Sequence, residues 1–210
     1  MSWAQDPGQD AKADIQAAAE APKIDGDVTD GAWTGKEIPG QQVDVYSGKA
    51  ANIQSVIYMT YDDKNVYIAA VMPEEKIDQV VADAKDRDGQ VWDDDALEIF
   101  IDPLNGEKGA KYYQIIVNSI GTIYDGQGKK NAWNGNITAA AKVDKEGKKW
   151  SVEVQIPLAD IGVEGSPKGQ TWLANFIRDR QSTGMAENFA WADVGEDAHN
   201  WNAFGHVTFK

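Results

Sequence analysis

The 210-residue chain contains no cysteine. This absence excludes disulfide bonds, thiolate metal sites and a cysteine nucleophile. The chain has only two histidines, His199 and His206, and it carries neither a Gly-x-Ser-x-Gly elbow nor a phosphate-binding glycine loop. No apolar run approaches the roughly 18 residues that a membrane-spanning helix needs. The sequence therefore lacks the signatures of several common enzyme classes and of a membrane-spanning helix.

Positive charge is also scarce. Lysine and arginine number 20 against 34 aspartates and glutamates, so the formal net charge is −14. An acidic chain is repelled by nucleic-acid phosphates and by anionic lipids, so we predict neither a nucleic-acid nor a membrane partner. The same charge suits neutral polar ligands, cations or a basic partner.

The first 21 residues differ in composition from the rest. They contain almost no large apolar side chain beyond Trp3 and Ile15, and residues 11–21 are rich in alanine. This composition predicts a linker or disordered N-terminal tail, in which residues 14–20 can form a short helix. No signal peptide is recognisable. We therefore place the folded domain at residues 22–210.

Most of the domain reads as short strands separated by turns. Alternating apolar positions predict the strands, and turn formers such as those of residues 62–65 join them. Nine or more strands without interleaved helices predict an all-β fold, an antiparallel two-sheet β-sandwich of jelly-roll or immunoglobulin-like kind. Short helices are few, the clearest being residues 158–161 after Pro157. The predicted strands span residues 55–61, 66–71, 97–101, 112–118, 121–125, 137–143, 150–156, 172–179 and 207–209.

The most informative segment is residues 91–103, in which a tryptophan and three aspartates precede an alternating strand. One face of this strand is apolar. The other face carries Glu98 and Phe100, a mixture that suits a polar ligand with an apolar side. The alternative is an ordinary half-buried strand whose outer face is solvated. On the same period-two argument we predict a core that contains Leu97, Ile99, Ile101, Trp150, Val152, Val154 and Ile156.

Eight tryptophans are many for a chain of this length. Trp150 and Trp172 alternate with apolar residues and are predicted to lie in the core. Trp92, Trp133 and Trp201 instead stand beside turn formers and polar residues. An exposed indole can stack on a pyranose ring while neighbouring amides and carboxylates bind the hydroxyls. The alternative is a loop tryptophan folded back over the edge of the core.

Several motifs together resemble family 9 carbohydrate-binding modules, over residues 22–210. The motifs are Ile24-Asp25-Gly26 with Asp30 and Trp33, Tyr67-Ile68-Ala69, Trp92 to Asp102, Tyr113 to Asn118 with Gly121, Trp150 to Pro157, Trp172 to Arg178, and Phe204-Gly205. The resemblance implies a β-sandwich of the kind found in secreted xylanases and other polysaccharide-processing proteins. It also implies sugar binding in a slot between two tryptophans, often at chain ends, and structural calcium.

The resemblance carries the two tryptophans over to Trp92 and Trp201. An arginine that such modules carry in the strand after the acidic motif is not evident, because Gln114, Ile116 and Asn118 stand there. Buried hydroxyls of a ligand each need a polar partner, which amides and carboxylates supply. Arg178 can add charge-assisted donors, or it can form an ion pair with one of the many carboxylates. The expected ligand-binding set is Trp92, Trp201, Glu98, Gln114, Asn118, Trp133 and Arg178.

Clusters of aspartate indicate where calcium would bind, since hard cations prefer oxygen ligands at short loop spacings. The clusters are residues 25–30, 86–88 and 93–95. None forms an EF-hand loop, because position twelve from Asp25 is Lys36. The alternative is a set of solvated acidic loops. The predicted calcium ligands are Asp25, Asp27, Asp93 and Asp94.

Three other functions compete with sugar binding. A glycosidase would pair Glu98 with Asp102 or with one of residues 93–95, but nothing in the sequence indicates that a second carboxylate converges on Glu98. A haem b electron-transfer domain would take axial ligands from His199, Met59, Met72 or Met185, none of which lies in a recognisable motif. A surface protein-interaction module is the third. We predict a non-catalytic module that binds mono-, oligo- or polysaccharide, within a larger multidomain protein that is extracellular or on the cell surface.

Overall fold

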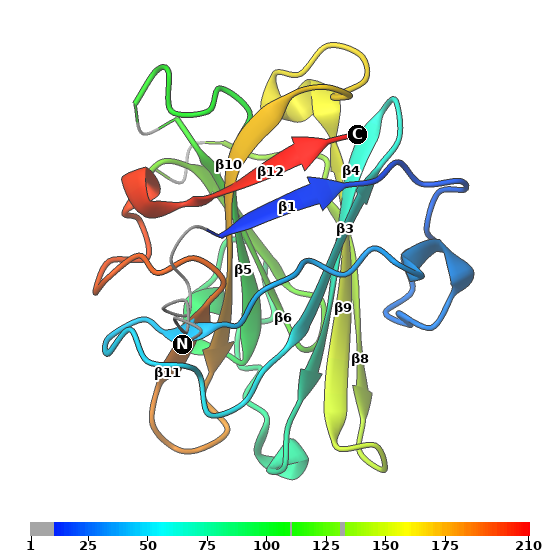
Figure 1. Ribbon diagram of the computed structural model, residues 1–210. Helices are drawn as coiled ribbons and strands as arrows, with labels where there is room; N and C mark the ends of the chain where they lie inside the picture. The colour runs from blue at the N-terminus through cyan, green and yellow to red at the C-terminus, as the bar shows by residue number, and fades with distance from the viewer. Residues whose placement is uncertain (1–10, 110, 131–132) are drawn as a thin grey trace, which may run out of the picture.

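The computed structural model describes residues 11–109, 111–130 and 133–210. Two β-sheets form the layers of a sandwich (Figure 1). One sheet has eight strands in the order β1-β12-β10-β5-β6-β7, with β11 paired to β10 and β2 paired to β11. The other sheet has four strands in the order β3-β4-β9-β8. The predicted two-sheet β-sandwich is therefore confirmed.

Neighbouring strands pair antiparallel, except β1 and β12, which are parallel. The larger sheet contains β1 (Lys12–Ile15), β2 (Val43–Asp44), β5 (Ala96–Asp102), β6 (Tyr113–Asn118), β7 (Ile123–Gln127), β10 (Thr171–Arg180), β11 (Glu187–Ala190) and β12 (Gly205–Phe209). The smaller sheet contains β3 (Val56–Tyr61), β4 (Asn65–Pro73), β8 (Thr138–Asp144) and β9 (Lys149–Pro157). The helical segments of the described residues are short 3₁₀ turns: η1 (Gly31–Trp33), η2 (Ile77–Gln79), η3 (Val91–Asp93), η4 (Leu158–Ile161) and η5 (Trp201–Ala203).

The main hydrophobic core lies between the two sheets and follows the period of two along each strand. All seven residues predicted for the core belong to it, and each is at most 1% exposed. Trp172 and Phe176 on β10 join the same cluster. Because Trp150 is fully buried, its truncation to alanine is expected to cost about 3–5 kcal/mol of stability.

A second, smaller core covers part of the outer face of the larger sheet. Phe100 on β5 and Ile177 on β10 point away from the main core and pack with Tyr112, Ala190 and Phe204. The segment between β11 and β12 supplies much of this cover, including Val194 and Phe204. The strands β5 and β10 are therefore apolar on both faces over part of their length, and Glu98 and Asp179 lie on the outer face beside this second core.

The predicted N-terminal tail needs a correction. Residues 12–15 form β1, which pairs in parallel with β12, and Ala13 and Ile15 are buried in the main core. These residues form a strand because their apolar side chains alternate with Lys12 and Asp14, so only one face is buried. The expected short helix over residues 14–20 is absent from this described segment. Residues 1–10 of the predicted tail lie outside the described residues.

Aspartates form the tight turns that the sequence indicated. Between β3 and β4, one carboxylate oxygen of Asp62 accepts the backbone N–H groups of Lys64 and Asn65 at 2.7 and 2.8 Å. Between β8 and β9, Asp144 accepts the N–H of Gly147 at 2.8 Å. These bonds satisfy backbone donors that the sheet leaves unpaired, which is why aspartate favours such turns.

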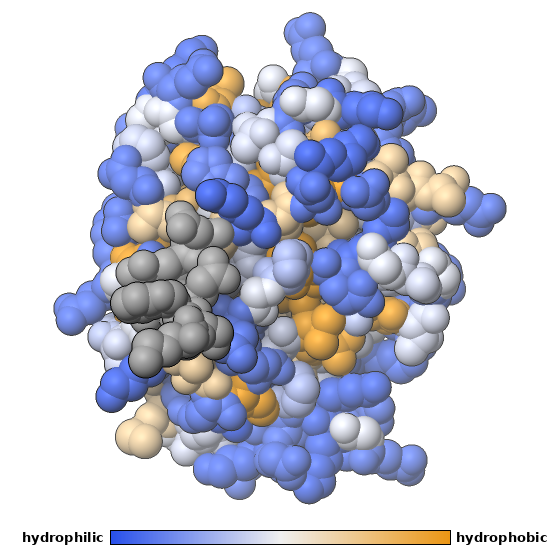
Figure 2. Space-filling view, viewed as in Figure 1, coloured by the Kyte–Doolittle hydropathy of each residue, from blue (hydrophilic) through white to orange (hydrophobic). Residues whose placement is uncertain are grey.

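The face shown in Figure 2 is mainly hydrophilic, with apolar atoms in small groups, the largest near the middle of the view. This distribution agrees with the 26% of charged residues in the chain. Among the described residues, no helix has the length and apolar character needed to cross a membrane.

Candidate functional site

A cleft of about 520 Å³ opens on the outer face of the larger sheet, beside the second core. Its floor carries Glu98 from β5, Gln114 from β6, Asp179 from β10 and Asn188 from β11. Three aromatic residues also line it: Trp92, Tyr124 and Tyr46. The strands that carry the floor are hydrogen-bonded neighbours, so the sheet itself sets the spacing of these polar groups.

Strand register explains why the floor residues lie together. Glu98 is opposite Ile177 on β10, so Asp179 is its diagonal neighbour on the same face. Gln114 is the diagonal neighbour of Glu98 on β6, because Glu98 is opposite Ile116. Asn188 is directly opposite Asp179 on β11. Four strands thus bring two carboxylates and two amides to one end of the outer face.

Each floor carboxylate accepts one hydrogen bond from an amide side chain. Gln114 Nε2 donates to Glu98 Oε1 at 2.5 Å, and Asn188 Nδ2 donates to Asp179 Oδ1 at 2.5 Å. The second oxygen of Asp179, Oδ2, is buried and has no hydrogen-bond partner among the described residues. Neither carboxylate forms an ion pair with a described cation. The floor therefore has unused capacity to accept hydrogen bonds.

Burial changes the acidity of both floor carboxylates. Glu98 is 6% and Asp179 2% exposed. Loss of hydration raises the pKa of Glu98 to about 7, although the hydrogen bond from Gln114 opposes the shift. Burial also raises the pKa of Asp179 well above its ordinary value, and the nearby charge of Glu98 adds to the rise. Two like charges this close disfavour each other, so the pair retains a proton at pH values where isolated carboxylates are ionised.

Trp92 provides an exposed aromatic surface at the cleft. It lies in η3, is 42% exposed and packs edge-on against Tyr124 of β7, with ring centroids 5.2 Å apart at 88°. The turn that holds it is fixed by Asp94, whose carboxylate accepts the N–H groups of Asp83 and Ala84 at 2.7 and 3.1 Å. The indole is therefore held by Tyr124 and by its turn, and its exposed part is open to a ligand.

Tyr46 lines the cleft from the edge of the sheet opposite to Trp92. It follows β2, which pairs with β11 beyond β10, whereas Trp92 contacts Tyr124 on β7 at the other edge. Tyr46 is 61% exposed, the largest exposure of any described aromatic residue. The cleft is thus bordered by aromatic rings from both edges of the sheet.

His199 and Lys129 complete the rim. Tyr112 Oη and His199 Nδ1 are 2.7 Å apart, and the imidazole packs edge-on against Phe100 with centroids 5.4 Å apart. Burial, followed by the charge of Lys129, lowers the pKa of His199, so the imidazole is neutral at pH 7. Lys129 Nζ lies 3.4 Å from the carboxylate of Asp197. The rim therefore adds little net positive charge.

Three of the predicted ligand-binding residues lie in this cleft: Trp92, Glu98 and Gln114. Asp93, predicted as a calcium ligand, lines it as well. The expectation that Trp92 and Trp201 border one cleft is corrected. Trp201 lies in η5, packs against the second core and lines an adjoining hollow of about 510 Å³ with Tyr112 and three lysines. The two hollows share His199 and Lys129 along their borders.

Asn118 and Trp133 also lie elsewhere. Asn118 is fully buried at the end of β6, where its Nδ2 donates to Asp94 Oδ2 at 2.8 Å and to the carbonyl of Ala84 at 3.0 Å. Through Asp94 it supports the turn that holds Trp92, but it does not line the cleft. Trp133 packs against Tyr113 with centroids 4.7 Å apart and ring planes tilted by 59°, and its indole N–H donates to the carbonyl of Asp160 at 3.2 Å. It therefore folds back over the edge of the main core.

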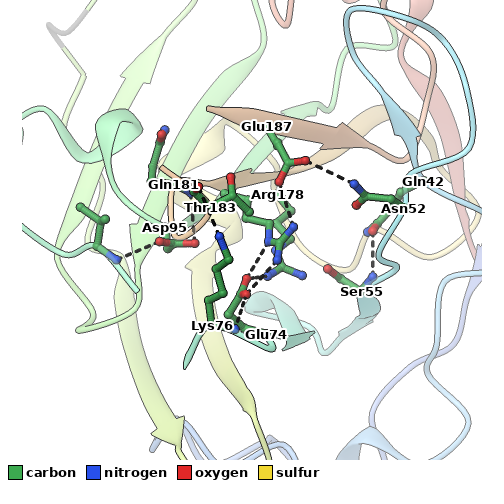
Figure 3. Close-up of polar contacts among 12 residues, drawn as sticks. Gln42, Asn52, Ser55, Glu74, Lys76, Asp95, Arg178, Gln181, Thr183 and Glu187 are labelled. Atoms are coloured by element: carbon green, nitrogen blue, oxygen red, sulfur yellow. Dashed lines mark hydrogen bonds and ion pairs between the residues drawn. The ribbon is translucent and has the colours of Figure 1, made fainter. Parts of the chain in front are cut away.

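Arg178 points to the inner face of the larger sheet, away from the cleft. Adjacent residues of a strand alternate in direction, so Arg178 and Arg180 face inward while Asp179 faces the cleft. Both guanidinium groups bind the buried carboxylate of Glu74, Arg178 at 3.0 Å and Arg180 at 2.6 Å (Figure 3). Arg180 also binds Glu187 at 2.8 Å. The ion-pair alternative is therefore the one that the structure shows for Arg178.

The four carboxylates predicted to bind calcium do not form one site. Asp25 binds Lys23 at 2.6 Å, and Asp27 binds Lys142 at 2.7 Å. Asp94 is occupied by backbone N–H groups and by Asn118. Within the described ranges, no three acidic or histidine side chains form a group that could hold a metal ion. Asp25, Asp27 and Asp94 thus already have partners that calcium would have to displace, and calcium binding stays a prediction.

The methionines proposed as haem ligands are also placed. Met59 and Met72 are buried in the main core between the sheets, at 1% and 0% exposure. Met185 is 74% exposed. The only candidate at the cleft is His199, whose Nδ1 is bound to Tyr112. Met59 and Met72 are thus on the opposite face of the larger sheet from His199, and the geometry gives no support to an axial pair.

Sequence reasoning missed several residues that line the cleft, among them Tyr46, Tyr124, Asp179 and Asn188. Asp179 was detectable from the sequence. It lies on the outer face of β10, a strand whose other residues are mainly apolar, and a carboxylate in such a strand is unusual. Asn188 and Tyr46 depend on the short strands β11 and β2, which show no clear alternation. Their position becomes apparent only when the strand pairing is known.

Comparisons with known proteins agree with this architecture. A family model described as "Carbohydrate family 9 binding domain-like" matches residues 24–210. The chain belongs to this family. No curated protein matches the chain. Matches are found among solved structures.

One is a candidate carbohydrate-binding protein from Bacteroides uniformis, 17% identical, with a TM-score of 0.74 over 95% of this chain and 99% of that one. Another is a family 9 carbohydrate-binding module from Caldicellulosiruptor kristjanssonii in complex with cellotriose, 17% identical, with a TM-score of 0.68 over 95% of this chain and 93% of that one. A third is a family 9 module from the same organism in complex with glucose, 17% identical, with a TM-score of 0.65 over 94% and 95%. At these identities the likeness shows the fold alone.

Proposed function

We propose that the outer-face cleft binds a sugar ring and that the protein acts as a non-catalytic carbohydrate-binding module. The observation that carries the proposal is an exposed indole, Trp92, next to a floor of carboxylates and amides that have free acceptor and donor capacity. A pyranose ring presents C–H groups on its faces and hydroxyls on its edges, which matches these two kinds of surface. Membership of the family and the glucose and cellotriose complexes of the Caldicellulosiruptor module support this choice of ligand class.

The arrangement of the carboxylates favours binding over hydrolysis. A glycosidase places two carboxyl groups on either side of the scissile bond. Glu98 and Asp179 instead lie on one face of one sheet, so both approach a ligand from the same side. Asp95 and Asp102 are occupied by backbone N–H groups at 2.8–3.2 Å. We expect cellotriose to remain intact during prolonged incubation with the protein, as followed by chromatography.

The proposal is tested by isothermal titration of glucose, cellotriose and a panel of other oligosaccharides into the protein. Trp92→Ala should weaken binding of the best sugar by roughly 30-fold or more, because stacked aromatics dominate such interfaces. Trp133→Ala is the matched control, since Trp133 covers the edge of the core and should leave affinity within about twofold. Glu98→Gln should also weaken binding, because hydroxyl donors lose an anionic acceptor. Equal affinity of Trp92→Ala and the parent protein would contradict the proposal.

The proposed function also suggests what kind of protein contains this domain and where that protein acts. A domain that binds sugar without cleaving it is useful beside an enzyme or a surface protein that acts on the same polysaccharide. We therefore propose that the domain is part of a larger extracellular or cell-surface protein and directs it to polysaccharide. Immunodetection of the native protein in culture supernatant, surface and cytosolic fractions tests this location, and recovery only from the cytosol would contradict it.

A further inference from the structure

The pair of carboxylates on the cleft floor differs from every other buried carboxylate in the described residues. Glu98 and Asp179 each accept a single hydrogen bond, from an uncharged amide, and Asp179 Oδ2 accepts none. The other buried carboxylates each accept at least two hydrogen bonds, and at least one of these donors is a backbone N–H or an arginine. They are Glu74, Asp94, Asp95, Asp102, Asp125 and Glu153. Asp125 Oδ1 is unpaired as well, but Asp125 Oδ2 accepts hydrogen bonds from Arg87 and from the N–H of Gly135.

This contrast indicates that the cleft carboxylates lack their partner in the free protein. A buried carboxylate without donors is unfavourable, because its hydration is lost and nothing replaces it. Asp93 and Asp95 lie close enough to raise the pKa of Asp179 further. On the rim, His199 is neutral at pH 7, and Lys129 lies beside the carboxylate of Asp197. The floor therefore presents uncompensated negative charge and free acceptor atoms to whatever occupies the cleft.

We propose that the ligand of this cleft is an amino sugar, a hexosamine with a free protonated amine, whose ammonium group binds between Glu98 and Asp179. This inference rests on the proposed sugar-binding function and names its substrate class. An ammonium group has three donors and no acceptor, so it matches two carboxylates that need donors. The ammonium group also carries a full positive charge, so it adds a charge–charge attraction to the two carboxylates that a neutral hydroxyl does not provide. Trp92, alongside, provides the surface on which the ring stacks.

The proton held by the carboxylate pair provides a second way to recognise a bound amino sugar, which is the release of this proton on binding. Because a bound ammonium favours the ionised form of both carboxylates, the retained proton leaves for the solvent on binding. A neutral sugar donates hydroxyls but brings no charge, so it displaces less of this proton. Calorimetry in two buffers with different ionisation enthalpies measures the number of protons released.

Three β-1,4-linked trimers separate the possibilities, because they differ only in the substituent at C2: the glucosamine trimer, cellotriose and the N-acetylglucosamine trimer. Each is titrated into the whole chain at pH 6, where the amines of the glucosamine trimer are protonated, with EDTA present. The glucosamine trimer should bind about tenfold more tightly than cellotriose, and the preference should shrink in high salt. The N-acetylated trimer, which has no charge, should show no such advantage. Proton release should be greater with the glucosamine trimer than with cellotriose.

Asp179→Asn is the decisive variant, because it removes the charge but keeps the shape and the pairing with Asn188. It should bring the affinities for the glucosamine trimer and cellotriose to within about twofold of each other. Asp144→Asn, on the β8–β9 turn, is the control and should preserve the preference.

If cellotriose binds the parent protein as tightly as the glucosamine trimer, the amino-sugar inference is overturned and sugar binding stands. If none of the trimers binds, the proposed function itself is contradicted. If lysine amide competes as well as the glucosamine trimer, the cleft recognises an amine alone and the inference is again overturned.

Discussion

The two faces of β10 handle buried charge in opposite ways. On the inner face, Arg178 and Arg180 enclose the carboxylate of Glu74, which is fully buried and ion-paired (Figure 3). On the outer face, one residue away along the strand, Asp179 is equally buried and has no cation. Successive side chains of a β-strand point to opposite faces, so these two environments are separated only by the sheet itself.

The pKa values reflect this difference. Burial acts to raise the pKa of Glu74, but hydrogen bonds from Arg180 and from the backbone N–H of Lys76, with the charge of Arg180, lower it to about 2. On the other face burial dominates, and it raises the pKa of Glu98 to about 7. Donors within the fold therefore satisfy the inner carboxylate, whereas the outer pair leaves its acceptors for a ligand. A cleft of this kind lowers stability in the free protein in exchange for binding.

The largest expected effect comes from breaking the inner cluster. Glu74→Gln leaves the buried guanidinium group of Arg178 without its carboxylate and leaves Arg180 with Glu187 alone. We expect it to lower the free energy of unfolding by about 3–5 kcal/mol. Glu75→Gln is the neighbouring control. Glu75 is exposed and binds exposed Lys148 at 2.6 Å, so its loss should change stability by less than about 1 kcal/mol. Urea denaturation measures the free energy of unfolding of both variants. Equal losses of stability would show that the buried ion pairs of Glu74 contribute no more than an exposed ion pair.

The same isosteric change on the outer face should have the opposite sign. Asp179→Asn removes a buried charge that the protein does not compensate, and we expect it to raise the free energy of unfolding at pH 7 by about 1–2 kcal/mol. Binding of the sugar should weaken in the same variant. A loss of stability instead would mean that the carboxylate is balanced within the free protein, which would remove the basis of the comparison.

Most of the fold was predictable because its signal is local. The alternating apolar residues of β5 and β9 specified both strands and the face that each buries, and the core residues followed from them. Only β1, β2 and β11 were missed. The two-residue β2 and four-residue β11 are too short to show a period, and β1 lies in an alanine-rich segment that the composition assigned to a tail.

The candidate site was predictable only in the part that one strand encodes. Trp92 and Glu98 belong to one motif, and Gln114 follows from its neighbouring strand. Asp179 required the pairing of β5 with β10, which are about 80 residues apart in the chain, and no local pattern specifies that pairing. Trp201 was misplaced for the same reason, because the long segment before β12 contributes to the second core in a way that only the structure shows.

The pH dependence of stability sharpens the comparison. The pKa of Glu98 is raised in the folded state above its unfolded value of about 4.3, so the folded state holds the proton more tightly. Its contribution is therefore fully favourable below about pH 4, and it is lost as the pH rises through about 7. Glu98→Gln should match the parent protein near pH 4 and become the more stable of the two at pH 8. The difference between parent and variant cancels the contribution of His199, and a constant difference from pH 4 to 8 would contradict the raised pKa.

The smallest expected effect concerns calcium at the acidic loops. Asp25 and Asp27 are exposed and bound to lysines, so calcium has to displace these ion pairs. We therefore expect a weak site at most, with an affinity near ~1 mM, and only a small rise in melting temperature between EDTA and millimolar calcium. Asp27→Asn should abolish the rise, whereas magnesium, which prefers a tighter octahedral shell, should not reproduce it. Coinciding melting curves in EDTA and calcium would show that these loops are solvated carboxylates, and sugar titrations repeated in both buffers would then give the same affinity.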